Sequence, residues 1–162
     1  MISRRKRFSM NTSFHPLPPG YTHVQHTFEP VFDEHSRILI LGSFPSVKSR
    51  ENQFYYGHPQ NRFWKLMALL LNVPVPQSID EKKTMLLTHG LALWDVIASC
   101  DIKGSSDSSI KNAVPADISR ILKAADIQTI IANGGTAFRL YRRYCEPVTG
   151  RPAALCPSTS PA

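Results

Sequence analysis

The segment RILILGS, residues 37–43, constrains the fold of this chain more than any other stretch. It places four consecutive aliphatic residues before a glycine and a serine. A strand with one solvent-exposed face alternates apolar and polar residues. A strand of a parallel sheet is covered by helices on both faces, and its sequence is a continuous apolar run. Residues 37–43 therefore predict a central strand of a parallel sheet.

Helical patterns separate this strand from later apolar segments. Residues 61–72 place Phe63, Trp64, Met67, Leu70 and Leu71 on one helical side. Residues 80–90 carry acids in the first turn and Gly90 where a C-terminal cap belongs. Two further helices are predicted at 115–125, with Pro115 at the first position, and at 136–145.

Three more segments are predicted as strands, at 91–97, 127–135 and 151–157, and the polar stretch 99–112 is predicted as a loop. This alternation defines an α/β class: a three-layer α/β/α sandwich around a small, mostly parallel four-stranded sheet. Residues 1–25 are basic and contain prolines, so we expect a flexible lead-in before a single domain at 26–162.

The charge of the chain favours a polyanionic partner. Lysine and arginine number 19 against 12 acids, which gives a net charge of +7 and a pI near 9.6. No apolar run approaches the roughly 20 residues of a membrane span, and no apolar region follows the basic start, so we expect a cytoplasmic protein. The three cysteines form no Cys-x-x-Cys pair, so neither a metal site nor a cluster is expected.

A ligand site is expected beyond the carboxyl ends of the parallel strands. Residues 42–46, 132–135 and 156–162 supply small residues, amides and hydroxyls there, and the loop FYYGHPQN, 54–61, adds aromatic rings. Such groups suit a flat, polar nucleobase better than a phosphate to be transferred, and no phosphate-binding glycine motif is present. Asp95 and Asp107 also follow strands; we expect them to cap turns, with a role as base for a water molecule as the alternative.

Five motifs in order carry a family resemblance: GSFPS, YYGHPQNRFWK, LALWDVI followed by GSSDSSI, IANGG, and PSTSPA. Over residues 26–162 they resemble the uracil-DNA glycosylase superfamily, most closely its hypoxanthine-DNA (deoxyinosine) glycosylase branch. The resemblance implies a monomeric repair enzyme that flips a deaminated nucleotide out of DNA. It implies hydrolysis of the N-glycosidic bond without metal or cofactor, which leaves an abasic site.

The resemblance also implies site residues. Mismatch-specific uracil glycosylases have a water-positioning Asn where this chain has Phe44, so Asn61 of the His-Pro-x-Asn segment is expected to carry catalysis instead, positioning water or bonding the leaving purine. Its alternative role is a helix N-cap. His58 is the second predicted catalytic residue. The remaining predicted residues are base-binding Ser43, Phe44, Tyr56 and Asn133, and DNA-backbone-binding Ser46, Ser158, Thr159 and Ser160.

Two alternatives stay open on the sequence. One is a mismatch-specific uracil-DNA glycosylase with the same pocket. The other is a catalytically inactive nucleic-acid-binding domain, because the family continues with a wedge loop and a helix where this chain stops at Ala162. The domain at 26–162 is thus expected to be truncated and to bind DNA more weakly than a longer relative.

Overall fold

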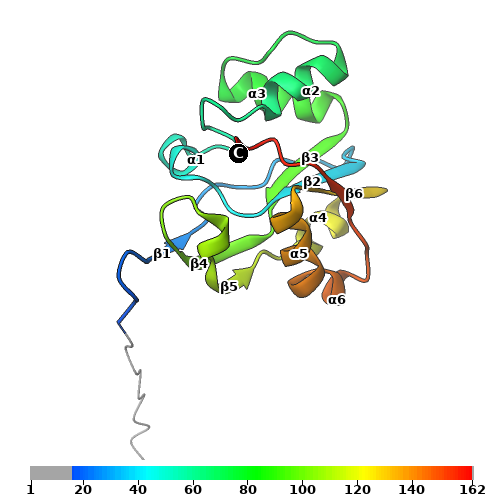
Figure 1. The fold of residues 1–162 in the computed structure, drawn as a ribbon. Coiled ribbons are helices and arrows are strands. Elements are labelled where there is room, and N and C mark those ends of the chain that lie inside the picture. Colours follow the sequence, from blue (N-terminus) through cyan, green and yellow to red (C-terminus); the bar gives the residue numbers. More distant parts are fainter. Residues whose placement is uncertain (1–15, 162) are drawn as a thin grey trace, which may run out of the picture.

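The central layer of the protein is a four-stranded, all-parallel sheet (Figure 1). The computed structural model describes residues 16–161; the basic segment Arg4–Arg7 lies outside the described residues. The strands are β2 (Ile38–Gly42), β3 (Leu91–Asp95), β6 (Thr129–Asn133) and β7 (Ala154–Cys156), in the order β3-β2-β6-β7. The predicted α/β architecture and parallel four-stranded sheet are confirmed.

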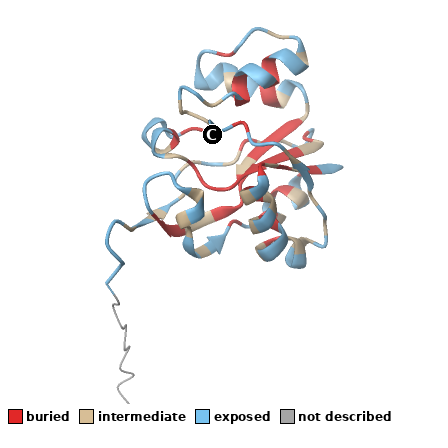
Figure 2. Cartoon of the chain, in the orientation of Figure 1, coloured by how far each residue is buried: buried red, intermediate tan, exposed pale blue. Residues whose placement is uncertain are grey.

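Helices cover both faces of this sheet, which explains the continuous apolar run in β2. Leu39 and Leu41 point to a core shared with α4 (Ser119–Ala124) and α5 (Gly135–Tyr144). Ile40 points to the opposite core, shared with α2 (Phe63–Leu71) and α3 (Ile79–Thr88). The short helix α6 (Glu146–Thr149) follows α5 directly. Figure 2 shows the buried residues concentrated on the central strands and the inner sides of these helices.

Leu70 is the exception in the predicted apolar side of α2. It is 68% exposed, whereas Phe63, Trp64, Met67 and Ala68 are buried. Ala68 takes the inward position that the sequence pattern assigns to Leu70. The expectation for Gly90 is confirmed: it follows α3 with a φ of +69°, a left-handed conformation that favours glycine.

A second, antiparallel sheet differs from three sequence interpretations. It has the order β1-β4-β5, with β1 at Thr22–Gln25, β4 at Ile97–Ile102 and β5 at Lys111–Pro115. The first difference is in the lead-in at 1–25, because Thr22–Gln25 form a strand paired with β4. Residues 91–97 are therefore not one strand, because the chain leaves β3 at Val96 and enters β4. The predicted loop 99–112 is wrong as well, since it holds the end of β4, a 3₁₀ turn at Asp107–Ser109 and the start of β5.

The sequence did not predict these strands because they contain polar residues, whose side chains hydrogen-bond to one another across the sheet. Asp101 on β4 pairs with His23 Nδ1 of β1 and accepts from Asn112 Nδ2 of β5, each over 2.8 Å. Pro115 ends β5 opposite Ile97 and does not open a helix, so α4 begins only at Ser119. Among the described residues, no helix is long and apolar enough to cross a membrane.

Candidate active site

A cavity of about 400 Å³ opens at the carboxyl ends of β2, β3 and β6. Its wall includes the start of α1 (Val47–Asn52), the loop between α1 and α2, and the last described residues, which run back beside α1 (Figure 1). Nine of the ten predicted site residues line it: Ser43, Phe44, Ser46, Tyr56, His58, Asn61, Asn133, Ser158 and Ser160. The tenth, Thr159, is buried and hydrogen-bonded to two of them.

The side chain of Asn61 has a fixed orientation. Its Oδ1 accepts from the backbone N–H of Phe63 over 2.9 Å and from the hydroxyl of Thr159 over 2.9 Å. Because a backbone N–H can only donate, the atom it meets must be the amide oxygen. The first bond reaches Phe63, the first residue of α2, but the N-cap of that helix is Arg62, which makes no side-chain capping bond, so the alternative N-cap role of Asn61 is wrong. Nδ2 has no partner among residues 16–161, and Asn61 therefore presents a hydrogen-bond donor to the cavity.

Asn133 and Thr159 hold each other in a reciprocal pair. The backbone N–H of Thr159 donates to Asn133 Oδ1 over 3.1 Å, and Asn133 Nδ2 donates to Thr159 Oγ1 over 3.0 Å. The side-chain oxygen of Asn133 is therefore occupied by a hydrogen bond from the loop at 158–160. The chain of bonds then continues from the Thr159 hydroxyl to Asn61, so the end of β6, the last loop and the start of α2 form one network.

His58 also shows a defined donor to the cavity. The backbone N–H of Gln60 donates to His58 Nδ1 over 3.1 Å. Nδ1 must therefore be unprotonated, and the neutral ring carries its hydrogen on Nε2. Asn61 and His58 thus offer two neutral donors from one short segment.

Tyr56 forms an aromatic wall of the cavity in an unusual backbone conformation. Its φ is +52°, which is rare for an aromatic residue, and its ring stacks on Phe63 with centroids 4.1 Å apart. Burial is the main cause that raises the pKa of Tyr56, with the charge of Asp95 adding to it. The Asn133 amide is near that hydroxyl and opposes the rise, although the two groups do not meet in hydrogen-bonding geometry.

Phe44, in the turn after β2, is a buried aromatic residue of the cavity wall. It is 7% exposed, and its ring meets the edge of His26 at 6.3 Å and the Arg50 guanidinium at 5.8 Å. It lines the cavity with a hydrocarbon surface and offers nothing to orient a water molecule.

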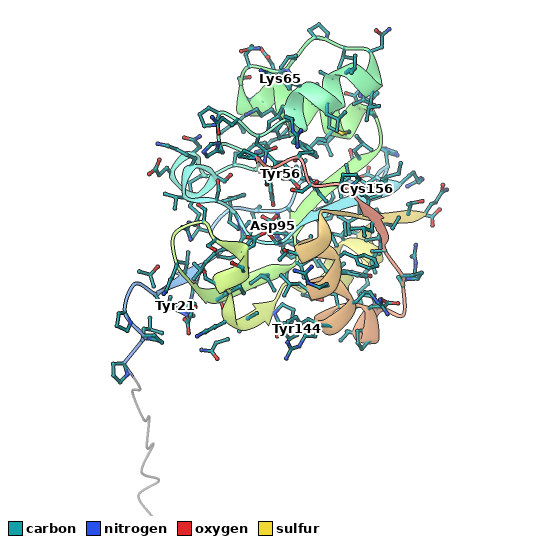
Figure 3. The ribbon with its side chains drawn as sticks, viewed as in Figure 1. Tyr21, Tyr56, Lys65, Asp95, Tyr144 and Cys156 are labelled. Atoms are coloured by element: carbon teal, nitrogen blue, oxygen red, sulfur yellow. The ribbon has the colours of Figure 1, made fainter. Side chains whose placement is uncertain are left out.

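Two carboxylates, Asp95 and Asp107, lie in the cavity wall and form hydrogen bonds with side chains distant in sequence. The sequence predicts that Asp95 and Asp107 cap turns, and neither does. Asp95, at the end of β3, pairs with His26 Nε2 over 2.8 Å, and both side chains are almost fully buried. Figure 3 shows Asp95 close to Tyr56 at the centre of the molecule. Asp107 accepts from Ser43 Oγ over 2.6 Å. Burial raises the pKa of Asp107, the Ser43 hydrogen bond opposes this, and the charge of Asp95 adds to the rise.

The serines expected to contact DNA have local partners. Ser46 caps α1, because its hydroxyl accepts from the backbone N–H of Ser49 over 3.1 Å. Ser158 Oγ accepts from the backbone N–H of Ser160 over 3.1 Å. Arg62, which sequence reasoning missed, donates from its side chain to the carbonyls of Ser158, Thr159 and Ser160 at 3.3–3.5 Å. Its position directly after Asn61 was the only signal for that role.

Comparison with known proteins identifies the family of the chain. Residues 29–162 match the uracil DNA glycosylase superfamily. The chain is 36% identical to a hypoxanthine DNA glycosylase of Methanosarcina acetivorans over 70% of this chain and 73% of that one. It is 37% identical to the hypoxanthine DNA glycosylase of Methanosarcina barkeri over 66% of this chain and 69% of that one.

A solved structure shows the same fold. The solution NMR structure of a candidate uracil DNA glycosylase from Methanosarcina acetivorans superposes with a TM-score of 0.71 at 32% identity, covering 82% of this chain and 83% of that one. Fold and cavity thus define an α/β protein with a nucleobase-sized site at the carboxyl edge of its sheet. The chain belongs to the uracil DNA glycosylase superfamily, as its motifs predicted.

Proposed function

We propose that the protein is a DNA glycosylase that hydrolyses the N-glycosidic bond of deoxyinosine, releasing hypoxanthine and leaving an abasic site as the first step of base-excision repair. Both Methanosarcina relatives are hypoxanthine DNA glycosylases, and the matching region of the superfamily includes the motif loops of the cavity. The observation that carries the proposal is the fixed polarity of Asn61, a neutral donor aimed into an aromatic-walled cavity.

Binding requires the damaged nucleotide to leave the base stack. The cavity of about 400 Å³ has room for a purine, and the rings of Tyr56 and Phe44 supply flat apolar surfaces for it. Stacking of a base on an aromatic ring is worth about 1–3 kcal/mol, which offsets part of the unstacking cost. The backbone around Ser46, Ser158 and Ser160, at the mouth of the cavity, is the proposed contact for flanking phosphates.

Bond cleavage places negative charge on the departing purine and positive charge on the sugar. A donor that meets the purine anion more strongly than the neutral base lowers the barrier. Asn61 Nδ2 and His58 Nε2 are such donors, and their partners within the protein hold them in place before the substrate arrives. Asn61 therefore bonds the leaving base and does not hold the water, since its oxygen is already occupied.

A substrate panel tests the proposal. Purified protein is incubated with labelled duplexes that carry inosine, uracil or xanthine, and abasic sites are then cleaved with alkali. We expect product from the inosine duplex and a loss of at least ~10²-fold in Asn61→Ala, the usual cost of one such donor. Product from uracil alone would instead assign a mismatch-specific uracil glycosylase, and retention on DNA without product an inactive binding domain.

A further inference from the structure

Hydrolysis of a glycosidic bond also needs a group that accepts the proton of the attacking water, and most acceptors in the cavity are already occupied. Asn61 Oδ1 accepts two bonds, Asn133 Oδ1 accepts from Thr159, and His58 Nδ1 accepts from Gln60. Among the described residues that line the cavity, only Asp95 and Asp107 are carboxylates.

Asp107 has a free oxygen at the cavity wall. Its Oδ2 accepts from Ser43 over 2.6 Å, and its Oδ1 has no partner among residues 16–161. Asp95 is less suited. Its Oδ2 is hydrogen-bonded to buried His26. Its Oδ1 packs so closely on the backbone of Gly42 that a Cβ added to that glycine would lie 2.3 Å from it.

The loop that carries Asp107 is anchored, although it is polar and rich in serine. The backbone N–H of Val47 donates to Ser105 Oγ over 2.8 Å, and Arg50 donates to the carbonyl of Gly104 over 3.1 Å. Together with the Ser43 bond, these contacts fix the loop to the turn that follows β2. The carboxylate thus stands beside the Ser43–Phe44 turn, on the wall of the same cavity as Asn61.

We propose that Asp107 orients the hydrolytic water and accepts its proton, a role that rests on the proposed glycosylase function. The water oxygen bonds to C1′ of the sugar while the bond from C1′ to N9 breaks and its electron pair leaves with hypoxanthine. One water proton passes to Asp107 Oδ1, which later releases it to solvent. The purine anion, held by Asn61, takes its proton from solvent. The negative charge of Asp107 also favours the positive sugar of the transition state.

The surroundings of Asp107 give its titration a defined direction. Asp95 of β3, Tyr56 of the loop after α1 and Cys100 of β4 interact electrostatically with Asp107. His58 lines the same cavity, and Arg50 of α1 donates to the carbonyl of Gly104 in the Asp107 loop. Burial and the charge of Asp95 raise the pKa of Asp107. The rate should therefore fall on the acid side at a higher pH than an ordinary aspartate would give, because only the ionised carboxylate accepts a proton.

The test is the pH dependence of single-turnover hypoxanthine release from an inosine duplex, for the wild-type protein, Asp107→Asn and the control Asp117→Asn. Asp117 is an exposed acid just before α4, away from the cavity. We expect Asp107→Asn to lower the maximal rate about 10²–10⁴-fold, to abolish the acid limb, and to keep the affinity for the inosine duplex. Asp117→Asn should match the wild type.

A second variant covers the case in which Asp107→Asn folds poorly. Ser43→Ala removes the hydrogen bond that lowers the Asp107 pKa, so the acid limb should move to higher pH. The acid limb is the fall in rate at low pH. The proposal would be overturned if Asp107→Asn kept the wild-type acid limb, or if Ser43→Ala left it at the same pH. Loss of the acid limb in Asp95→Asn would also overturn it. No release of hypoxanthine by the wild-type protein would instead refute the proposed function itself.

Discussion

The hydroxyl of Thr159 donates a hydrogen bond to the side-chain oxygen of Asn61 over 2.9 Å, across 98 positions of sequence. The same hydroxyl accepts from Asn133, so the end of β6 holds the Thr159 side chain, while the backbone N–H of Phe63 fixes which Asn61 atom is the oxygen. The last described loop is therefore a part of the active site that acts through Asn61.

Thr159→Val should lower the rate of hypoxanthine release by up to about tenfold, the worth of one typical hydrogen bond. Valine keeps the shape of threonine but cannot donate to Asn61, so the amide loses one of its two restraints. Thr159→Ser retains the hydroxyl and should stay near the wild-type rate. Single-turnover assays at saturating enzyme measure both, and equal rates for the valine and serine variants would show that the bond is irrelevant.

Gly42→Ala should reduce the rate by about 10²-fold, the effect expected from displacing a site by about 1 Å. A Cβ there would lie 2.3 Å from Asp95 Oδ1 and 3.2 Å from the Tyr56 hydroxyl, so both must move. Gly135→Ala is the matched control at the first residue of α5, because its Cβ would meet only the end of the Arg139 side chain at 3.5 Å. Similar rates for the two variants would contradict the tight packing of the cavity floor.

Gly134→Ala should destabilise the protein by roughly 1–3 kcal/mol, the usual cost of a backbone conformation that only glycine adopts easily. Gly134 has a φ of +103°, and a Cβ there would lie 3.0 Å from that of Ser158. The loop at 158–160 must shift as well, so the rate should fall too. Gly150→Ala, with a φ of +66° and nothing within 4 Å, should cost about 1 kcal/mol and leave the rate unchanged. Urea unfolding measures the free energies, and a rate loss in Gly150→Ala would argue against a local effect.

Asp107→Asn should make the protein more stable at neutral pH while it removes activity. A raised pKa means that the folded protein binds the proton more tightly than the unfolded chain, so stability falls as the pH rises from the ordinary aspartate pKa through the raised one. Asparagine cannot ionise, so this loss disappears in the variant. The difference in unfolding free energy between Asp107→Asn and the wild type should vanish in acid and grow towards neutral pH. If Asp107→Asn were less stable than the wild type at neutral pH, the raised pKa of Asp107 would be contradicted.

Strands β2, β3 and β6 of the parallel sheet were predictable because they contain continuous apolar runs, whereas β7 is a short strand whose Leu155 is 55% exposed. The loops that meet at the cavity were predictable too, since the carboxyl ends of parallel strands share one edge. Asn133, at a strand end, can therefore be assigned to this edge from the order of elements, whereas Tyr56 and Asn61 were assigned to the site through the family resemblance.

The second sheet escaped prediction because Asp101, His23 and Asn112 satisfy one another across strands, a pairing that no local pattern reveals. For Asp107 the sequence favoured a turn cap and gave the role of base for a water molecule only as the alternative. Its environment comes from Ser43, 64 positions away, so a carboxylate in a serine-rich stretch reads as an ordinary turn. The polarity of Asn61 likewise depends on Thr159, and only the folded chain shows that its amide oxygen is occupied.

The central claim is that the Asn61 amide steadies the departing purine, and a single comparison tests it. Hypoxanthine release from an inosine duplex is followed in a single turnover, with enzyme in excess, for the wild-type protein and Asn61→Ala, alongside the affinity of each for the same duplex. A rate about 10²–10³-fold lower at nearly unchanged affinity is the expected result. Equal rates for the two proteins would contradict the account.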